Sequence, residues 1–401
     1  MNTEDQTRTA ASEGSPLNFN DEVRKGFQIP PNVLLHDVTL RDGEQSPGVV
    51  FNIEDRVRVA QALDSLGVHR IEAGFPVISD EDREGVTAVA EAGLQAEVWG
   101  FGRCLPGDVE VNAKCSVKNM VLEIAISESK MQAYGTDRKQ VVARMLAALE
   151  RAKELGLTVA FMPVDLTRAD LEFARKIISL AVEKGGADEI IVVDTIGVAS
   201  PEAIYYLTKN IREWVDVPLA IHCHNDFGLA LANSIAGLKG GAHCIHESIN
   251  SLGERAGNVD LAETVLALQL MYDVDLGIQT ERLYETSRLI EKISGYKVAF
   301  NKSVTGELVF ARESGGVVQQ LLSNPASVEP YDPALVGQNR SVVLGKKSGR
   351  FSISHALGRL NLQANEEEIT SALQVIKQRY GKKQGLVSDD EFISIINELR
   401  K

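Results

Sequence analysis

The stretch P-L-A-I-H-C-H-N-D, residues 218–226, decides how the rest of this chain is interpreted. An apolar run leads directly into two histidines that are separated by one residue. Side chains at positions i and i+2 of a strand point to the same side, so we expect His222 and His224 to project together from the end of a buried strand. Two imidazoles on one face form half of a divalent-metal site, although two strand histidines with ordinary hydrogen bonds fit the same spacing.

Composition limits the class of protein. The 401 residues suffice for one large domain and a smaller one. The net charge of −14 argues against nucleic acid or an anionic membrane surface as the main partner. No apolar run reaches membrane-spanning length. The four cysteines form no C-x-x-C pair, which is typical of a reduced protein, so we expect a cytoplasmic location.

Apolar runs recur along the chain, and each is followed by a helical pattern. The runs are continuous rather than alternating, as in strands buried on both faces of a parallel sheet. They cover residues 32–40, 69–75, 96–102, 119–127, 158–165, 189–195, 218–226 and 244–250. The clearest helical pattern between them covers residues 137–155. Eight such units predict a TIM (β/α)8 barrel. A doubly wound sheet is the rival fold, but no G-x-G-x-x-G follows the first strand.

The rhythm of the sequence changes after the eighth unit, and this change defines the domains that we predict. Residues 1–29 are interpreted as a flexible N-terminal arm, and residues 30–285 as the catalytic barrel. Residues 286–401 are predicted to form a smaller α-rich accessory region, with its last helix over residues 388–399. Ser388 is expected to cap that helix, with Glu391 completing a capping box.

Polar motifs follow three of the predicted strands, at the end of a barrel where active sites form. L-R-D-G-E-Q follows the first strand, the two histidines end the seventh, and G-E-R-A-G-N follows the eighth. These strands are neighbours once a barrel closes, so Asp42, His222, His224 and Asn258 are expected to meet. This donor set suits Mn²⁺, Mg²⁺, Zn²⁺ or Fe²⁺. Taken alone, Asp42 fits a turn or helix-cap aspartate better than a ligand, and Asn258 a loop asparagine; their joint placement favours the metal site.

Four motifs together carry a specific resemblance. They are D-V-T-L-R-D-G-E-Q-S-P-G at 37–48, D-T-I-G at 194–197, H-C-H-N-D-F-G at 222–228 and G-E-R-A-G-N at 253–258. With these motifs the chain resembles the DRE-TIM metallolyase family, in the branch of the isopropylmalate, homocitrate and citramalate synthases. The resemblance extends from about Val33 to Arg350 and includes G-K-K-S-G-R at 345–350.

The resemblance implies a metal-dependent condensation of a 2-oxo acid with an acyl-CoA, such as acetyl-CoA, to a 2-alkylmalate- or homocitrate-type product. It implies that Asp42, His222, His224 and Asn258 hold the divalent metal, and that the protein is a homodimer. The residues that we assign to substrate binding are Arg41, Gln45, Glu72, Arg103, Thr195 and Arg312. The residues that we assign to catalysis are Arg41, Asp165 and Glu313.

The chain differs from the synthase branch at the positions that, by the resemblance, would transfer protons. Val164 replaces a glutamate, Arg312 a histidine and Val328 a tyrosine, and Lys130 stands where a histidine is usual. Valine cannot accept a proton, and arginine is always protonated. Glu44 and Glu72 are further candidates for the base besides Asp165 and Glu313.

Three functions remain open at the level of sequence. The leading hypothesis is the condensing acyltransferase, with Arg312 and Lys130 binding an extra anionic group of a changed substrate. The alternative is a CoA-independent, metal-dependent aldolase or lyase that acts on a 2-oxo acid or a 2-hydroxy acid, as the lost glutamate, histidine and tyrosine suggest. The third is a non-catalytic protein that senses a 2-oxo acid or partners an active homologue.

Overall fold

The computed structural model describes residues 15–25 and 28–400. Contacts divide these residues into two compact units, one covering Leu17–Val298 and one that begins at Ala299. The first unit is built on a barrel of parallel strands. The strands are β1 Leu34–Asp37, β2 Arg70–Glu72, β3 Glu97–Arg103, β4 Asn119–Ala125, β5 Thr158–Val164, β6 Glu189–Asp194, β7 Leu219–Cys223 and β8 Cys244–Glu247.

The barrel closes because β1 pairs with β2 on one side and with β8 on the other. In register, His36 of β1 stands beside Arg70 of β2 and His246 of β8. Every residue of β6, β7 and β8 is buried, as the continuous apolar runs predict. The predicted TIM barrel is therefore confirmed.

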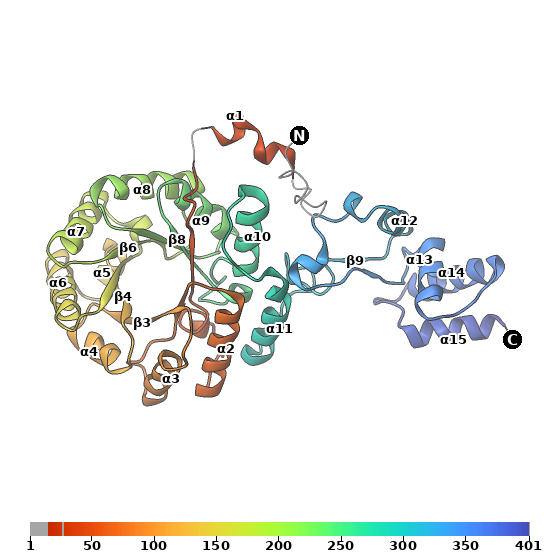
Figure 1. Ribbon diagram of the computed structural model, residues 1–401, viewed down its shortest axis with the longest axis horizontal. Coiled ribbons are helices and arrows are strands. Elements are labelled where there is room, and N and C mark those ends of the chain that lie inside the picture. Colours follow the sequence, from red (N-terminus) through yellow and green to blue (C-terminus); the bar gives the residue numbers. More distant parts are fainter. Residues whose placement is uncertain (1–14, 26–27, 401) are drawn as a thin grey trace. The chain divides into compact units, whose positions relative to one another are not determined.

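Helices surround the strands on the outside of the barrel (Figure 1). They are α2 Ile53–Leu66, α3 Asp80–Ala90, α4 Pro106–Lys114, α5 Glu128–Ala133, α6 Arg138–Glu154, α7 Leu171–Glu183, α8 Pro201–Trp214, α9 Ala230–Lys239, α10 Leu261–Tyr272 and α11 Leu283–Ser294. Helix α6 forms where the clearest periodic pattern predicts it. Asp137 caps it by accepting a hydrogen bond from the Gln140 amide at 2.8 Å, and Val141, Met145 and Leu149 are buried on its inner face.

The predicted boundary between residues 285 and 286 falls inside α11. This helix contacts α2 and the 3-10 helix η5 (Ile249–Ser251), so it belongs to the barrel unit. At the other end, the described part of the predicted arm contains a 3-10 helix, Pro16–Phe19, and the short helix α1, Asp21–Arg24. The prediction of a flexible arm over residues 1–14 and 26–27 lies outside the described residues.

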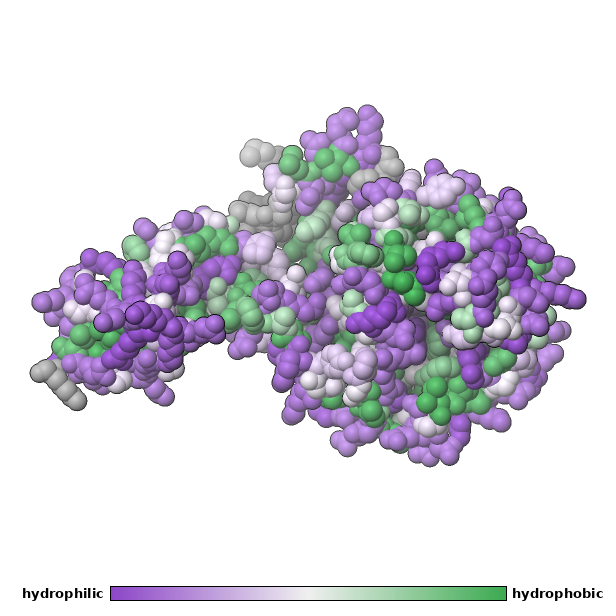
Figure 2. Space-filling model, turned by 180° about the vertical axis from the view of Figure 1, so that it is seen from behind, coloured by the Kyte–Doolittle hydropathy of each residue, from purple (hydrophilic) through white to green (hydrophobic). Residues whose placement is uncertain are grey.

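The second unit is helical and has its own core. It contains α12 Gly315–Ser323, α13 Arg350–Arg359, α14 Glu366–Tyr380 and α15 Asp389–Leu399, together with the short parallel pair β9 Ala311–Arg312 and β10 Ser341–Val342. Its apolar side chains gather between α13, α14 and α15, with Phe392 fully buried among them. The surface of this unit in Figure 2 is mainly hydrophilic, as expected when the apolar residues pack inside.

The last helix begins as predicted, with one difference. Ser388 caps α15 by accepting a hydrogen bond from the Glu391 amide at 3.2 Å. The Glu391 carboxylate does not complete the box but accepts a hydrogen bond from the Tyr380 hydroxyl of α14. Among the described residues, none of the helices is long and apolar enough to cross a membrane.

Candidate active site

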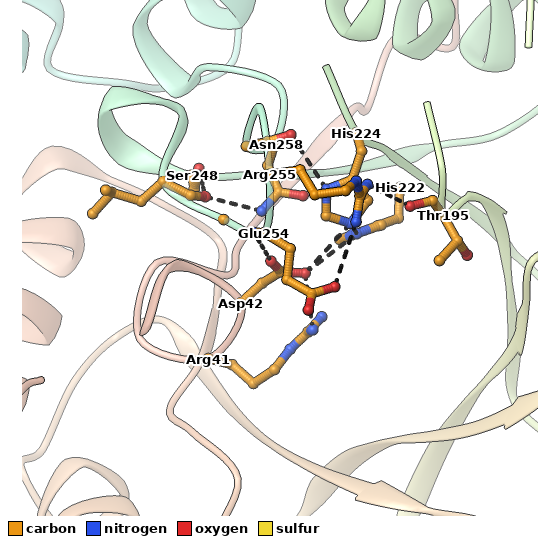
Figure 3. Close-up of polar contacts among 12 residues, drawn as sticks. Arg41, Asp42, Thr195, His222, His224, Ser248, Glu254, Arg255 and Asn258 are labelled. Carbon is orange, nitrogen blue, oxygen red and sulfur yellow. Dashed lines mark hydrogen bonds and ion pairs between the residues drawn. The ribbon is translucent and has the colours of Figure 1, made fainter. Parts of the chain in front are cut away.

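Three of the four predicted metal ligands converge at the carboxyl ends of β1 and β7 (Figure 3). Asp42 precedes the 3-10 helix η3, Gly43–Gln45, and its Oδ2 lies 3.6 Å from His222 Nε2 and 3.7 Å from His224 Nε2. The two Nε2 atoms are 3.3 Å apart. All three side chains are buried. This is the convergence that the i, i+2 spacing predicts.

Asn258 supplies the fourth donor from the loop after β8. Its backbone forms an isolated bridge with that of His224, which holds it beside the cluster. Its Nδ2 donates to the Leu252 carbonyl at 2.9 Å, but its Oδ1 is buried and receives no hydrogen bond from any described residue. A buried oxygen without a partner costs about 1–3 kcal/mol. A bound cation would satisfy it, so these residues fit a divalent metal.

The protonation of the two histidines also suits metal binding. Burial, together with the neighbouring His224, holds the pKa of His222 well below its usual value, and burial lowers the pKa of His224. His224 Nδ1 lies 3.2 Å from the carbonyl oxygen of Gly257. A carbonyl only accepts, so the proton sits on Nδ1, and Nε2 keeps the lone pair that a metal needs.

Asp42 is held as a carboxylate. Burial by itself would raise the pKa of Asp42, but the Arg41 guanidinium and the two imidazoles outweigh it and lower the pKa to about 2. Arg41 Nη1 donates to Asp42 Oδ2 at 3.0 Å, and the Glu254 amide donates to Oδ1 at 3.2 Å. An anion is therefore present at the site at any physiological pH.

Two glycines of G-E-R-A-G-N are required by this geometry. Gly253 has φ +157°, and a Cβ there would lie 2.4 Å from Asn258 Nδ2 and 3.0 Å from Asp42 Oδ1. Gly257 has φ +83°, and a Cβ there would lie 1.8 Å from the Ser251 carbonyl oxygen. Any side chain at either position would displace the metal ligands or their supports.

A cavity of about 510 Å³ opens beside the predicted ligands Asp42, His222 and His224, which we call the metal-ligand cluster. Asp42, His222 and His224 form part of its wall, and residues from several other strands and from α5 and α6 complete it. The polar residues of that remaining wall include Arg41, Gln45, Arg103, Glu123, Lys130, Arg144, Thr195 and Glu254. The apolar residues include Phe101, Ala125, Met162 and Val164. This volume accommodates a small organic acid beside a metal ion.

Arg41 joins the cavity to a buried network. Its Nε donates to Glu72, whose other oxygen lies 3.2 Å from His36 Nε2. Its guanidinium stacks over the Phe101 ring, with Cζ 4.2 Å from the ring centroid. Its Nη2 is buried and has no hydrogen-bond partner among the described residues. Arg41 is thus held rigidly while one donor remains available to a bound molecule.

Of the other substrate-binding residues predicted in the barrel, three line the cavity and one does not. Gln45 and Thr195 line the cavity, and the Thr195 Oγ1 accepts a hydrogen bond from the Asp165 amide at 2.8 Å. Arg103 also lines it, but its guanidinium is paired with Asp108 through bonds of 2.8 and 3.1 Å. Glu72 lies behind Arg41 and is fully buried, so it orients Arg41 instead of lining the cavity.

The residues considered as bases already have other partners. Asp165 is fully buried, receives two hydrogen bonds from Arg168 at 2.8 and 2.7 Å and one from Ser127, and does not line the cavity. Glu44 accepts the Phe51 amide at 2.8 Å and pairs with Arg56. Neither carboxylate is available in this arrangement.

Arg312 and Glu313 belong to the second unit, where both bond to nearby backbone. The Arg312 guanidinium donates to the carbonyls of Val309 at 2.8 Å and Val328 at 3.1 Å. Glu313 accepts the Lys347 amide at 2.6 Å. Their predicted roles in substrate binding and catalysis stay predictions.

Two cavity carboxylates were not predicted as site residues from the sequence: Glu254, which lies within the motif G-E-R-A-G-N, and Glu123. Glu123 lies on β4 and faces the cavity, where Val164 leaves the end of β5 without an acid. The run over residues 119–127 is typical of a continuous buried strand, and its single acid carries no motif. A charged residue inside an otherwise apolar strand run was the signal that could have identified it.

Comparison with known proteins places this site in a family. A family model described as HMGL-like matches residues 32–290, more than half of the chain. The chain belongs to the HMGL-like family. Members of the HMGL-like family depend on a divalent metal, in agreement with the donor set of the barrel. A second model, described as homocitrate synthase post-HMGL domain-like, matches residues 304–384.

Several HMGL-like relatives resemble the chain over most of its length. Homocitrate synthase AksA of Methanopyrus kandleri is 41% identical over 379 residues, which cover 94% of this chain and 95% of that protein. (R)-citramalate synthase CimA of Methanocaldococcus jannaschii is 38% identical and covers 92% of this chain and 74% of its own. The 2-isopropylmalate synthase of the same organism is 37% identical, with coverage of 95% and 74%. The resemblance to the synthase branch is confirmed.

A solved structure agrees with the HMGL-like barrel. HMG-CoA lyase of Bacillus subtilis superposes with a TM-score of 0.60 at 21% identity and covers 67% of this chain and 96% of that chain. At this identity the likeness concerns the fold alone.

Proposed function

We propose that this chain is a divalent-metal-dependent acyltransferase that condenses a 2-oxo acid with an acyl-CoA, such as acetyl-CoA, to a 2-alkylmalate- or homocitrate-type product. The observation that carries the proposal is the cavity in which the predicted ligands Asp42, His222 and His224 lie together with Arg41, whose Nη2 has no hydrogen-bond partner among the described residues. The names of the relatives, all of them synthases that form 2-hydroxy acids of this type, support the reaction class.

Asp42, His222, His224 and Asn258 would hold the ion. When bound, the ion supplies Lewis acidity to the oxygens of the 2-oxo acid. The chain itself contributes a fixed anion at Asp42 and neutral imidazoles, which need no proton release at neutral pH before they can act as ligands.

Arg41 and Thr195 provide donors for the oxygens of the substrate. Arg41 Nη2 can donate to the keto oxygen, where negative charge develops as the new bond forms. The Thr195 hydroxyl accepts from the Asp165 amide, so its own proton is free to donate to the substrate carboxylate. Gln45 adds an amide to the same wall.

Basic side chains give the cavity a positive rim. Lys130 and Arg144, from α5 and α6, line it together with Arg103. Their charges favour binding of carboxylate, phosphonate or CoA phosphate groups, although the chain as a whole is acidic. This charge supports an acidic small molecule as the substrate.

A thiol-release assay tests the proposal. Mn²⁺- or Mg²⁺-loaded enzyme is mixed with acetyl-CoA and each member of a panel of 2-oxo acids, and free CoA is measured. We expect CoA release that depends on both the metal and one oxo acid. His222→Ala should abolish release, whereas His243→Ala, at a half-buried histidine outside the cluster, should retain it. Absence of release across the whole panel would refute the condensation.

An aldolase or lyase without CoA is the second candidate, favoured by one observation. Val164, Met162 and Ala125 form an apolar wall where the synthase pattern has an acid. This candidate expects aldehyde-dependent consumption of a 2-oxo acid, or formation of a 2-oxo acid from a 2-hydroxy acid, by enzyme that ignores acetyl-CoA. Finding neither reaction in metal-loaded enzyme would remove it.

The homodimer and the cytoplasmic location stay predictions. Analytical ultracentrifugation of the full chain and localisation of the tagged protein would test them separately. A small-molecule reaction is the whole of the proposal, and it includes neither nucleic acid nor a membrane as a partner.

A further inference from the structure

Glu123 lies on the side of the cavity that β4 and β5 form, where Val164 provides no acid. On β4 it stands in register with Arg103 of β3 and Met162 of β5, and all three line the cavity. Ala125 and Val164 form the next pair in the same direction on β4 and β5. The Glu123 carboxylate is therefore one strand away from Val164 and one layer deeper in the cavity.

Within the described chain, no hydrogen bond or ion pair joins the side-chain carboxylate of Glu123 to another residue, whereas its backbone carbonyl accepts the Cys104 amide at 2.8 Å. This distinguishes it from Asp165, Glu44 and Glu72, each of which is held by an arginine. A half-buried carboxylate without a partner costs folding free energy, and such a cost persists mainly where a group serves a function. Because the Glu123 carboxylate has no partner among the described residues, both of its oxygens are available to a bound molecule.

We propose that Glu123 is the base that removes a proton from the carbon beside the thioester carbonyl of the acyl-CoA. This inference rests on the proposed condensation and deepens it, because it assigns the proton acceptor that Val164 cannot provide. Arg41, which touches the same cavity, is positioned to act on the other substrate, so the two reacting carbons would meet between β1 and β4.

The step balances without a further reagent. The C–H bond of the acyl group breaks, its proton passes to the Glu123 carboxylate, and its electron pair forms the enolate. The enolate carbon then bonds to the keto carbon, whose C=O electron pair moves onto oxygen and takes a proton from water. Water cleaves the thioester, giving its hydroxyl to the carbonyl carbon and a proton to sulfur. Glu123 returns its proton to solvent.

The electrostatic surroundings of Glu123 suit this role. Burial raises the pKa of Glu123 to about 7, against the attraction of Arg41 and Lys130. The titratable and charged groups that act on it from the neighbouring elements are Arg41, Asp42, Glu72, Arg103, Cys104 and Lys130. A base whose pKa is close to the working pH is both ionised and strong enough to accept a proton.

The test compares Glu123→Gln and Glu123→Asp with the wild type in the full, Mn²⁺-loaded enzyme. We expect Glu123→Gln to lower kcat for CoA release at least about 100-fold. It should also abolish solvent-deuterium exchange into the acetyl methyl group of acetyl-CoA, while calorimetry gives an unchanged affinity for the 2-oxo acid. Glu123→Asp should restore part of the rate and shift the pH at which kcat rises relative to the wild type.

The possible outcomes separate the two proposals. Wild-type enzyme that releases no CoA with any oxo acid overturns the condensation itself. If the wild type turns over, and Glu123→Gln keeps its rate, its deuterium exchange and its pH profile, Glu123 is not the base. Unchanged oxo-acid binding by Glu123→Gln excludes misfolding as the cause of a lost rate. Glu183→Gln, at an exposed position at the end of α7, is the matched control and should behave as wild type.

Discussion

At the scale of single residues, Asn258 has a side-chain oxygen that no described residue hydrogen-bonds. Its Oδ1 is buried, its backbone forms a bridge with that of His224, and its Nδ2 donates to the Leu252 carbonyl. That carbonyl also accepts the Ser248 hydroxyl at 2.6 Å, so it stays satisfied when the amide is removed. The side chain therefore matters more for the metal than for the fold.

Replacing this amide should weaken metal binding selectively. We expect Asn258→Ala to lower Mn²⁺ affinity about 10- to 100-fold in calorimetry, with a loss of about 1 kcal/mol in the free energy of unfolding. Asn233→Ala is the control, because its Oδ1, on α9, is likewise buried without a hydrogen-bond partner in the described part of the chain, and Asn233 is not one of the predicted metal ligands. Equal Mn²⁺ affinities of the two variants would contradict the assignment.

Glu123 should affect the stability of the protein as well as the reaction. The pKa of Glu123 is raised from 4.5 to about 7 in the folded protein. Glu123 therefore leaves the free energy of unfolding unchanged below about pH 4.5, and its destabilising effect reaches its full size above about pH 7. If a carboxyl group is a tenfold weaker acid in the folded protein than in the unfolded chain, its ionisation lowers the free energy of unfolding by about 1.4 kcal/mol. Solvent at the cavity wall reduces the effect.

We therefore expect Glu123→Gln to raise the free energy of unfolding by about 1–2 kcal/mol at pH 8 and to leave it unchanged near pH 4.5. Denaturant unfolding of the metal-free protein at both pH values measures this difference. Glu183→Gln should change neither value, since its carboxylate is exposed. A stabilisation that is the same at both pH values would disprove the electrostatic origin.

At the scale of elements, the loop after β8 does most to shape the metal-ligand cluster. The Gly257 carbonyl accepts the Asn225 amide at 2.9 Å and fixes the tautomer of His224. Ser46, after β1, exchanges two 3.0 Å hydrogen bonds with the backbone of Gly253. One loop thus connects the ends of β1, β7 and β8.

A side chain at Gly257 should disturb this loop. Gly257→Ala places a Cβ against the Ser251 carbonyl, so we expect a loss of about 1–3 kcal/mol in unfolding free energy and weaker Mn²⁺ binding. Gly228→Ala is the matched control, because its φ is also positive, +72°, but its Cβ would meet nothing within 4 Å. It should cost only about 1 kcal/mol and bind Mn²⁺ normally. Equal effects of the two changes would argue against steric displacement of the ligands.

The strands and the placement of His222 and His224 could be predicted from the sequence, because each follows from a single periodicity. Hydrogen-bond partners were harder to predict, because a side chain can pair with several neighbours. Continuous apolar runs predicted the strands of the barrel, and the i, i+2 spacing placed His222 and His224 together. The sequence also placed Asp165 at the end of β5. It did not predict that Asp165 pairs with Arg168, and in this pairing Asp165 does not line the cavity. Glu123 was missed because only the barrel register shows which face of a buried strand lines the cavity.

At the scale of the whole molecule, the chain contains two units with separate cores. The barrel core surrounds the strands, whereas the core of α13–α15 is formed by residues 344–396. A disturbance of the second core should therefore remain local.

Phe392→Ala tests this separation. Truncating a fully buried phenylalanine costs about 3–5 kcal/mol, so we expect α13–α15 to lose hydrogen-exchange protection. The strands of the barrel should keep their protection, and Mn²⁺ affinity should be unchanged. Phe351→Ala, on an exposed position of α13, should leave both units protected. Loss of protection throughout the barrel would show that the two units unfold together.

The spread of the ligand set along the chain has a consequence for biosynthesis. Asp42 and Asn258 are separated by 216 positions, and the loop that carries Asn258 is tied to Ser46 only after β8 has joined β1. A nascent chain that has left the ribosome only as far as His224 has three of the proposed donors but no closed ring of strands to hold them together. If these residues hold the metal as proposed, we expect its capture to be a late event in the maturation of this protein. A truncated translation product would compete poorly for the metal, and occupancy of the site reports that the barrel has been completed.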